Sequence, residues 1–182
     1  MAGDLTTLFD RLAQSRDRVL TLVAATDEPH RATRPGAGQW SMLQVIEHLV
    51  LAEEGTLRVL RQGPGPQPRV TVRSRLALRA IEVLFGLGAR VRVPSKSLAP
   101  AGADSLDTLR SRWNEAREGI AAVVEGLDAE ALRQPRFRHP VAGWLTVGQG
   151  LDFLERHIRH HERQLHRIRR ALNPPQPIEG PT

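Results

Sequence analysis

The chain of 182 residues contains no cysteine, and Lys96 is its only lysine. Without cysteine it has no disulfide, no thiolate nucleophile and no sulfur ligand, so a metal would have to be bound by histidine and carboxylate side chains. The lack of disulfides is typical of cytoplasmic proteins, and we expect that location. No apolar run reaches the roughly 18 residues of a membrane-spanning helix. The amphipathic N-terminal sequence, which contains acidic residues, resembles neither a secretory signal nor a transit peptide.

Aromatic residues are also scarce, at 4% of the chain. The formal net charge of +6 favours anionic partners in general. However, the arginines are spread along every segment, and no basic cluster is interleaved with aromatic residues. We therefore expect a small-molecule substrate and no nucleic-acid partner. The remaining composition, 40% hydrophobic and 25% charged, is ordinary for one globular domain.

Apolar residues repeat at helical spacing in four long segments. The predicted helices cover about 4–26, 41–61, a segment beginning near Ser105, and 147–172. Two of these helices begin with a capping box, in which a Ser or Thr side chain and a Gln three residues later satisfy each other's backbone N–H groups. These capping boxes are Ser41 with Gln44 and Thr146 with Gln149.

The long connection between the second and third helices decides the topology. Residues 63–68, GPGPQP, end the second helix, and the crossover 63–101 is far longer than a helical hairpin needs. Such a crossover lets two consecutive helices run parallel, and residues 73–90 within it predict an extra short helix. We therefore predict an all-α four-helix bundle without a β-sheet. Residues 1–173 are expected to form a single domain, and 174–182 a disordered tail.

Histidines are concentrated on the last predicted helix. Four of the chain's seven lie there: His157, His160, His161 and His166. At about 100° per residue, His161 falls within the apolar stripe and His157 at its edge one turn earlier, while the other two are predicted to face solvent. A pair at i and i+4 can chelate one ion. The spacing is also common by chance, and a buried histidine is often only a hydrogen-bonded packing residue, so both interpretations stay open.

The second helix offers polar side chains on apolar faces. His48 lies on a secondary apolar strip, and Glu53 lies within the main stripe, where a carboxylate is costly unless it is paired, protonated or close to a cation. Glu53, or Glu47 beside His48, could accept a hydrogen bond from a metal ligand, and Glu53 could equally pair with an arginine. Gln164 could be a pocket group or a hydrogen-bonding residue at the bundle edge. Trp40 is expected mainly to anchor the start of a helix.

Several motifs together carry a family resemblance. They are GxWS at 38–41, HL at 48–49, HPxxGxLT at 139–146 and HxxxH at 157–161, followed by Gln164. In this order and spacing they resemble the DinB/YfiT-like superfamily over about residues 4–172. The resemblance implies a four-helix bundle with a parallel central pair and a divalent metal, nickel, zinc or iron, bound by His48, His157 and His161. Characterised members include transferases and isomerases that use mycothiol, bacillithiol or glutathione.

The expected function is therefore a metal-dependent transferase or hydrolase. Three histidines would hold the ion, and Glu53 and Gln164 would accept a hydrogen bond from a ligand or line the pocket. The ion would activate water or an external low-molecular-weight thiol. The alternative is a non-catalytic stress-response or binding protein of the same fold, with a structural metal or none. The crossover could border the pocket or form the contact of a homodimer.

Overall fold

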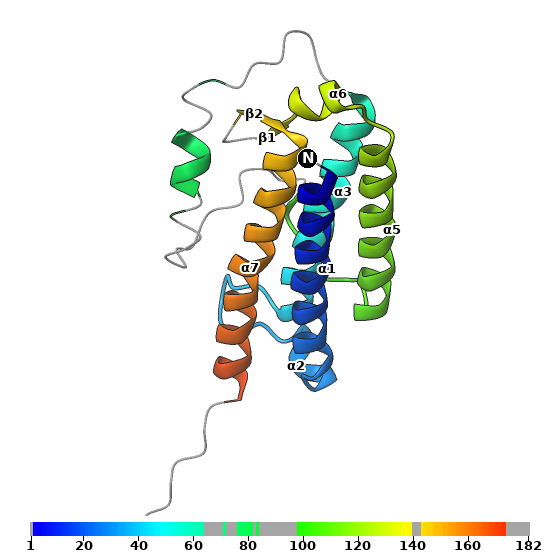
Figure 1. The fold of residues 1–182 in the computed structure, drawn as a ribbon. Coiled ribbons are helices and arrows are strands. Elements are labelled where there is room, and N and C mark those ends of the chain that lie inside the picture. Colours follow the sequence, from blue (N-terminus) through cyan, green and yellow to red (C-terminus); the bar gives the residue numbers. More distant parts are fainter. Residues whose placement is uncertain are drawn as a thin grey trace, which may run out of the picture.

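Four long helices run side by side along one axis (Figure 1). The computed structural model describes residues 2–63, 71, 76–81, 83, 98–139 and 143–173. The long helices are α1 (Ala2–Ala24), α3 (Met42–Gln62), α5 (Leu106–Glu125) and α7 (Val147–Leu172), and two short helices, α2 (Glu28–Ala32) and α6 (Ala129–Arg133), lie between them. The predicted four-helix bundle is confirmed. Among the described residues, no helix is both long and apolar enough to cross a membrane.

The helix starts follow from local capping chemistry. The Ser41 hydroxyl accepts from the Gln44 N–H at 3.2 Å, and the Gln44 side chain accepts from the Ser41 N–H at 3.1 Å. Thr146 and Gln149 form the same reciprocal pair. Both predicted capping boxes are thus confirmed, because their hydrogen bonds form within a single turn and need no distant partner.

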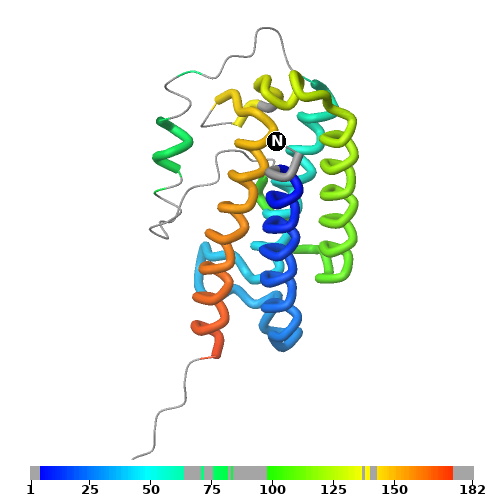
Figure 2. The backbone as a smooth tube through the Cα atoms, in the orientation of Figure 1, coloured from blue at the N-terminus to red at the C-terminus, as the bar shows by residue number. Residues whose placement is uncertain are grey.

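The bundle consists of two parallel pairs (Figure 2). Helices α1 and α7 run in the same direction, because residues further along α1 contact residues further along α7. The three contacts are Arg11 with Asp152, Ser15 with Glu155, and Arg18 with Glu162. The pair of α3 and α5 also runs in one direction, opposite to the first, and the crossover supplies the length of chain that this requires. The predicted parallel arrangement of consecutive helices is confirmed.

The core lies between the four helices and includes Trp113, which is fully buried. The crossover adds to this core, because residues 76–81 and 83 are helical and Leu78 and Ile81 are buried. The predicted extra helix is confirmed for these residues. The rest of the predicted helix 73–90 and the tail 174–182 lie outside the described residues.

A two-stranded hairpin in the connector before α7 corrects the prediction that the chain has no β-sheet, while the all-α fold class holds. Strand β1 (Pro135–His139) pairs antiparallel with β2 (Gly143–Thr146). Leu145 is 1% exposed and anchors the hairpin on the core. Strands this short give too little alternation to be recognised from sequence, because their stability comes from the partner strand and the packing beneath. The short helix α2 was also not predicted.

A buried ion pair joins α3 to α5. Both oxygens of Glu53 accept from the guanidinium of Arg117, with Nε at 2.7 Å from Oε2, and the two side chains are 1% and 9% exposed. Of the two sequence interpretations of Glu53, the structure shows the arginine pair. The sequence could identify the need for a partner but not which of the arginines would meet it.

Removing one member of this pair should destabilise the fold strongly. Glu53→Ala leaves a buried guanidinium without its counter-ion, and we expect it to lower the free energy of unfolding by about 3–5 kcal/mol. The neighbouring Glu54→Ala breaks a half-buried pair with Arg112 and should cost about 1 kcal/mol or less. Urea denaturation of both variants measures the difference. Equal losses of unfolding free energy in the two variants would contradict the prediction that the buried Glu53 pair stabilises the fold more than the half-buried Glu54 pair.

Candidate metal centre

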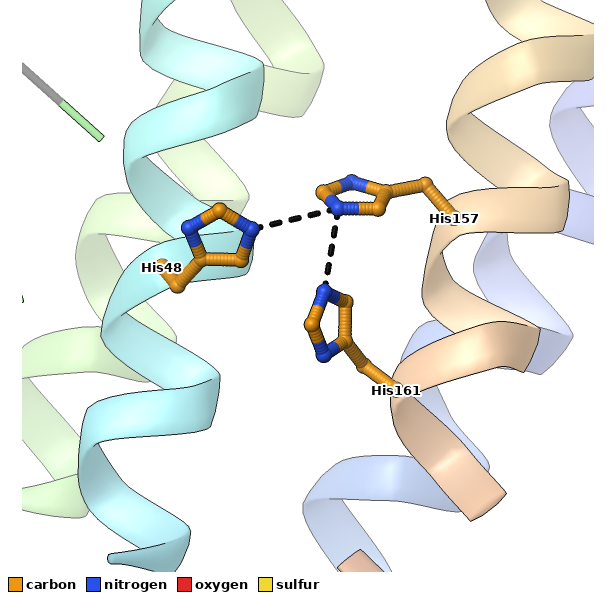
Figure 3. A group of neighbouring side chains, drawn as sticks. All are labelled: His48, His157 and His161. Atoms are coloured by element: carbon orange, nitrogen blue, oxygen red, sulfur yellow. Dashed lines mark hydrogen bonds between the residues drawn. The ribbon is translucent and has the colours of Figure 1, made fainter. Parts of the chain in front are cut away.

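Three imidazoles from α3 and α7 converge on one point (Figure 3). The Nε2 atom of His157 lies 3.1 Å from Nε2 of His48 and 3.1 Å from Nε2 of His161. The residues are 3%, 9% and 7% exposed for His48, His157 and His161. One helix thus supplies two rings at i and i+4, and the facing helix supplies the third.

Outward hydrogen bonds determine where two of these rings carry their hydrogen. Nδ1 of His48 lies 2.8 Å from the carbonyl oxygen of Leu98, and Nδ1 of His161 lies 2.8 Å from Oε1 of Gln164. Both oxygens can only accept, so each Nδ1 donates. Because a neutral imidazole has a single N–H, Nε2 of His48 and of His161 must each present a bare lone pair to the centre.

The surroundings favour the neutral form of all three rings. Burial lowers the pKa of His48, against the opposing effect of its bond to Leu98. Burial, together with repulsion from neighbouring histidines, lowers the pKa of His157 and His161 well below 6.5. Neutral imidazole is the form that binds a metal, and the environment favours it at neutral pH.

The three rings cannot satisfy one another. A neutral His157 has at most one hydrogen on Nε2, so it can donate to only one of the two lone pairs that face it. In the other contact a lone pair would face Nε2 of His157 at 3.1 Å with no hydrogen between the two nitrogens. A cation between the rings removes this conflict, because each lone pair then has a positive partner.

The two nitrogen separations at His157 also fit one small divalent ion, and all three candidate nitrogens lie within 4.8 Å of one another. Metal–nitrogen distances of about 2.0–2.1 Å place the nitrogens about 3.3 Å apart in a tetrahedral site and about 3.0 Å apart on one face of an octahedral site. The two observed separations of 3.1 Å lie between these values. Three imidazole ligands suit zinc, nickel, iron and copper, and leave coordination positions open for another group.

Aromatic rings pack against the ligands and restrict their orientation. The Trp40 ring lies 5.0 Å from His48 and 6.5 Å from His161, centroid to centroid, and Phe153 stacks on His157 at 5.8 Å. Trp40 therefore contacts the site besides preceding the cap of α3. Sequence reasoning missed the role of Phe153, although its position four residues before His157 places it on the same helix face.

The predicted supporting residues have different positions. Gln164 lies beside the three histidines and is hydrogen-bonded to His161. Glu53 does not accept from a ligand: it pairs with Arg117, and a five-residue offset from His48 turns it about 140° round the helix. Glu47 instead accepts from the N–H groups of Ala101 and Gly102. The acceptor for His48 is the Leu98 carbonyl, which no side-chain pattern could reveal.

Two further histidines lie close to the centre. His160, predicted to face solvent, is only 6% exposed, and its ring lies 5.1 Å from that of His161. The prediction was wrong because a single apolar stripe does not describe a helix that packs against both α1 and α3. His139, expected in a turn, lies in β1 with its ring 4.4 Å from Phe153.

The fold and this centre define a class: helical bundles with a histidine cluster between two helices. The sequence profile of the DinB superfamily matches residues 9–165, and the chain belongs to that superfamily. It is similar to the uncharacterized protein YuaE of Bacillus subtilis (strain 168), with 23% identity over 139 residues, or 76% of this chain and 83% of YuaE. It is also similar to TT2238, whose crystal structure is described as a four-helix bundle protein, with 25% identity and a TM-score of 0.58. That match covers 89% of this chain and 98% of TT2238.

The buried neutral histidines should make the metal-free protein sensitive to acid. Burial lowers the pKa of His139 to about 4 from 6.5. The unfolded chain therefore binds more protons than the folded one between these values, and stability falls as the pH drops from 6.5 toward 4. Relative to His139→Gln, the wild type should lose about 2 kcal/mol more on going from pH 7.5 to 4.5.

Urea denaturation of the metal-free wild type and of His139→Gln across this range measures the effect. The comparison cancels the contribution of carboxylates, which titrate in both proteins. Parallel curves of unfolding free energy against pH would contradict the assignment of His139 as a half-buried group that folding keeps neutral.

Proposed function

We propose that the chain binds one divalent metal ion through Nε2 of His48, His157 and His161. The observation that carries this proposal is that hydrogen bonds within the protein turn the lone pairs of His48 and His161 toward Nε2 of His157, which can donate a hydrogen to only one of them. Zinc, nickel and iron are the candidate ions. Membership of the DinB superfamily supports the assignment, since the three residues occupy the positions that the family resemblance implies.

We further propose that the protein is a metal-dependent transferase or hydrolase. A divalent ion on three neutral imidazoles supplies a Lewis acid that makes water or a thiol more acidic. The chain has no cysteine, so the sulfur for thiol chemistry would come from an external low-molecular-weight thiol. Trp40 and Phe153 would hold the ligand rings in place, and Gln164 would hold the hydrogen of His161 outward.

One observation favours the alternative of a non-catalytic protein with a structural metal. The three ligand residues are at most 9% exposed, which limits access to the ion. A buried site of this kind could serve stability alone, in a binding or stress-response role. Catalytic activity therefore decides between the two functions.

We also propose a small-molecule substrate rather than nucleic acid, a cytoplasmic location and a homodimer. The homodimer has one structural feature in its favour: Leu76 and Val83 of the crossover are 66% and 60% exposed. They lie seven residues apart, on one face of the crossover helix, and apolar side chains on one face can form a contact between subunits.

Metal content tests the first proposal. Protein purified without a histidine tag should bind about one equivalent of Zn²⁺ or Ni²⁺ in equilibrium dialysis. His48→Ala should reduce binding severely, whereas His166→Ala, on the same helix as the other two ligands but outside the cluster, should not. At a hundredfold excess over Kd, the ion should raise the free energy of unfolding by about 2.7 kcal/mol. Unchanged stoichiometry in His48→Ala would place the ion elsewhere.

An activity assay tests the second proposal, that the protein is a metal-dependent transferase or hydrolase. The metal-loaded wild type, given glutathione, mycothiol or bacillithiol and a panel of electrophiles, should accelerate loss of free thiol, and ester substrates should report hydrolysis. His48→Ala and His157→Ala should reduce the rate by at least about a hundredfold, because they remove the group that acidifies the nucleophile. Metal-loaded protein that binds its ion stoichiometrically yet is inactive throughout would favour the structural role.

A further inference from the structure

The end of the crossover is bonded to two consecutive residues of α3. We call residues 98–102 the clamp segment. The Leu98 carbonyl accepts from Nδ1 of His48 at 2.8 Å. The N–H groups of Ala101 and Gly102 donate to the two oxygens of Glu47 at 3.0 and 2.6 Å. One short segment therefore contacts a proposed metal ligand and the residue before it.

Glu47 holds this segment by strong bonds. Glu47 is 6% exposed, and each oxygen of its carboxylate accepts from a different backbone N–H. Hydrogen bonds to an ionised acceptor are stronger than those between neutral groups, and leaving a buried carboxylate without them is costly. The two bonds fix the position of the clamp segment relative to α3.

Gly102 makes this approach possible. Its φ of +79° lies in the left-handed region, and a Cβ there would come within 3.0 Å of Cγ of Gln44. Gln44 is itself held in the capping box that begins α3. Only a glycine lets the backbone pass so close to Gln44 and direct its N–H at Glu47.

We propose that Glu47 is a positioning residue of the metal centre, acting on His48 through the clamp segment. By holding Ala101 and Gly102, it keeps the Leu98 carbonyl where it fixes the ring orientation and tautomer of His48. This inference rests on the proposed metal site, and it adds a residue that neither binds the metal nor contacts His48 by a side-chain hydrogen bond in the described structure.

The coupling has a defined direction and size. If the clamp segment loosens, Nδ1 of His48 loses its acceptor and the ring populates the other tautomer and other orientations. Only the fraction with a bare Nε2 facing the centre binds the ion, so the apparent Kd rises as that fraction falls. Loss of such a supporting contact typically weakens metal binding about 10–100-fold. By linkage, the ion should in turn stabilise the clamp segment by the same factor.

Glu47→Gln in the full-length protein is the first test. Glutamine keeps one acceptor oxygen but loses the charge and the second acceptor. Competition with a chromophoric chelator should show a Kd for Zn²⁺ at least about tenfold above wild type. In metal-free protein, ¹⁵N NMR of the imidazoles should show His48 as the single Nδ1-protonated tautomer in wild type, and as a mixture in the variant.

Asp128→Asn is the matched control. Asp128 also accepts a backbone N–H, from Ala131 at 2.7 Å, but it caps α6 at the end of the bundle away from the start of α3 (Figure 1). The same carboxylate-to-amide change there should leave the Zn²⁺ affinity and the His48 spectrum as in wild type.

Gly102→Ala provides a second test should Glu47→Gln fail to fold. It should weaken Zn²⁺ binding and disturb the His48 tautomer in the same way. Gly63→Ala imposes similar backbone strain, since Gly63 has φ +74°, but a Cβ there meets its nearest neighbour at 3.9 Å, at the other end of α3. It should leave both readouts unchanged.

The outcomes separate this inference from the proposed function. An unchanged His48 tautomer, or a Kd within about threefold of wild type in the folded Glu47 or Gly102 variant, overturns the role of Glu47. If the wild type binds no Zn²⁺, Ni²⁺ or Fe²⁺, the proposed metal site fails. The tautomer of His48 in metal-free protein still decides whether Glu47 positions that ring.

Discussion

The candidate metal centre depends on one electrostatic constraint: the lone pairs of His48 and His161 are both directed at Nε2 of His157. Hydrogen bonds to Leu98 and Gln164 hold the hydrogens of His48 and His161 on the outer nitrogens. Burial keeps the rings neutral, so protonation does not relieve the repulsion. Ordinary packing of histidines does not require such an arrangement. A bound cation would account for it, and its binding would offset the cost of assembling the centre.

The topology explains how the constraint is met. Two of the three histidines lie one turn apart on α7 and require no long-range folding event, whereas the third must come from a facing helix. The crossover leads the chain from the end of α3 back to the start of α5, and its end returns to the level of His48. The same connection thus creates the parallel pair and supplies the carbonyl that orients the His48 ring. Fold and site share one structural element.

Local interactions were the part of this structure that the sequence could predict. The capping boxes at Ser41 and Thr146 and the apolar position of His161 depend on neighbours within one or two turns. His48 could be recognised as a candidate from its apolar surroundings, but its assignment as a ligand came from the family resemblance. The sequence also showed that Glu53 needed a partner.

Features that depend on distant segments were missed. Arg117 lies 64 residues from Glu53, and the acceptor for His48 is a backbone atom 50 residues away. The burial of His160 follows from packing of α7 on more than one neighbour, which a helical wheel of one segment does not contain. The hairpin of β1 and β2 was missed for the same reason, since each strand is too short to be recognised without the other.

X-ray absorption spectroscopy at the zinc edge tests the central claim most directly. In zinc-loaded protein, the fine structure should show three imidazole nitrogens at about 2.0–2.1 Å, with the outer-shell scattering typical of histidine rings. His48→Ala should reduce that number to two in whatever metal remains bound. A first shell dominated by carboxylate oxygens, or one with fewer than three imidazoles in the wild type, would contradict the account.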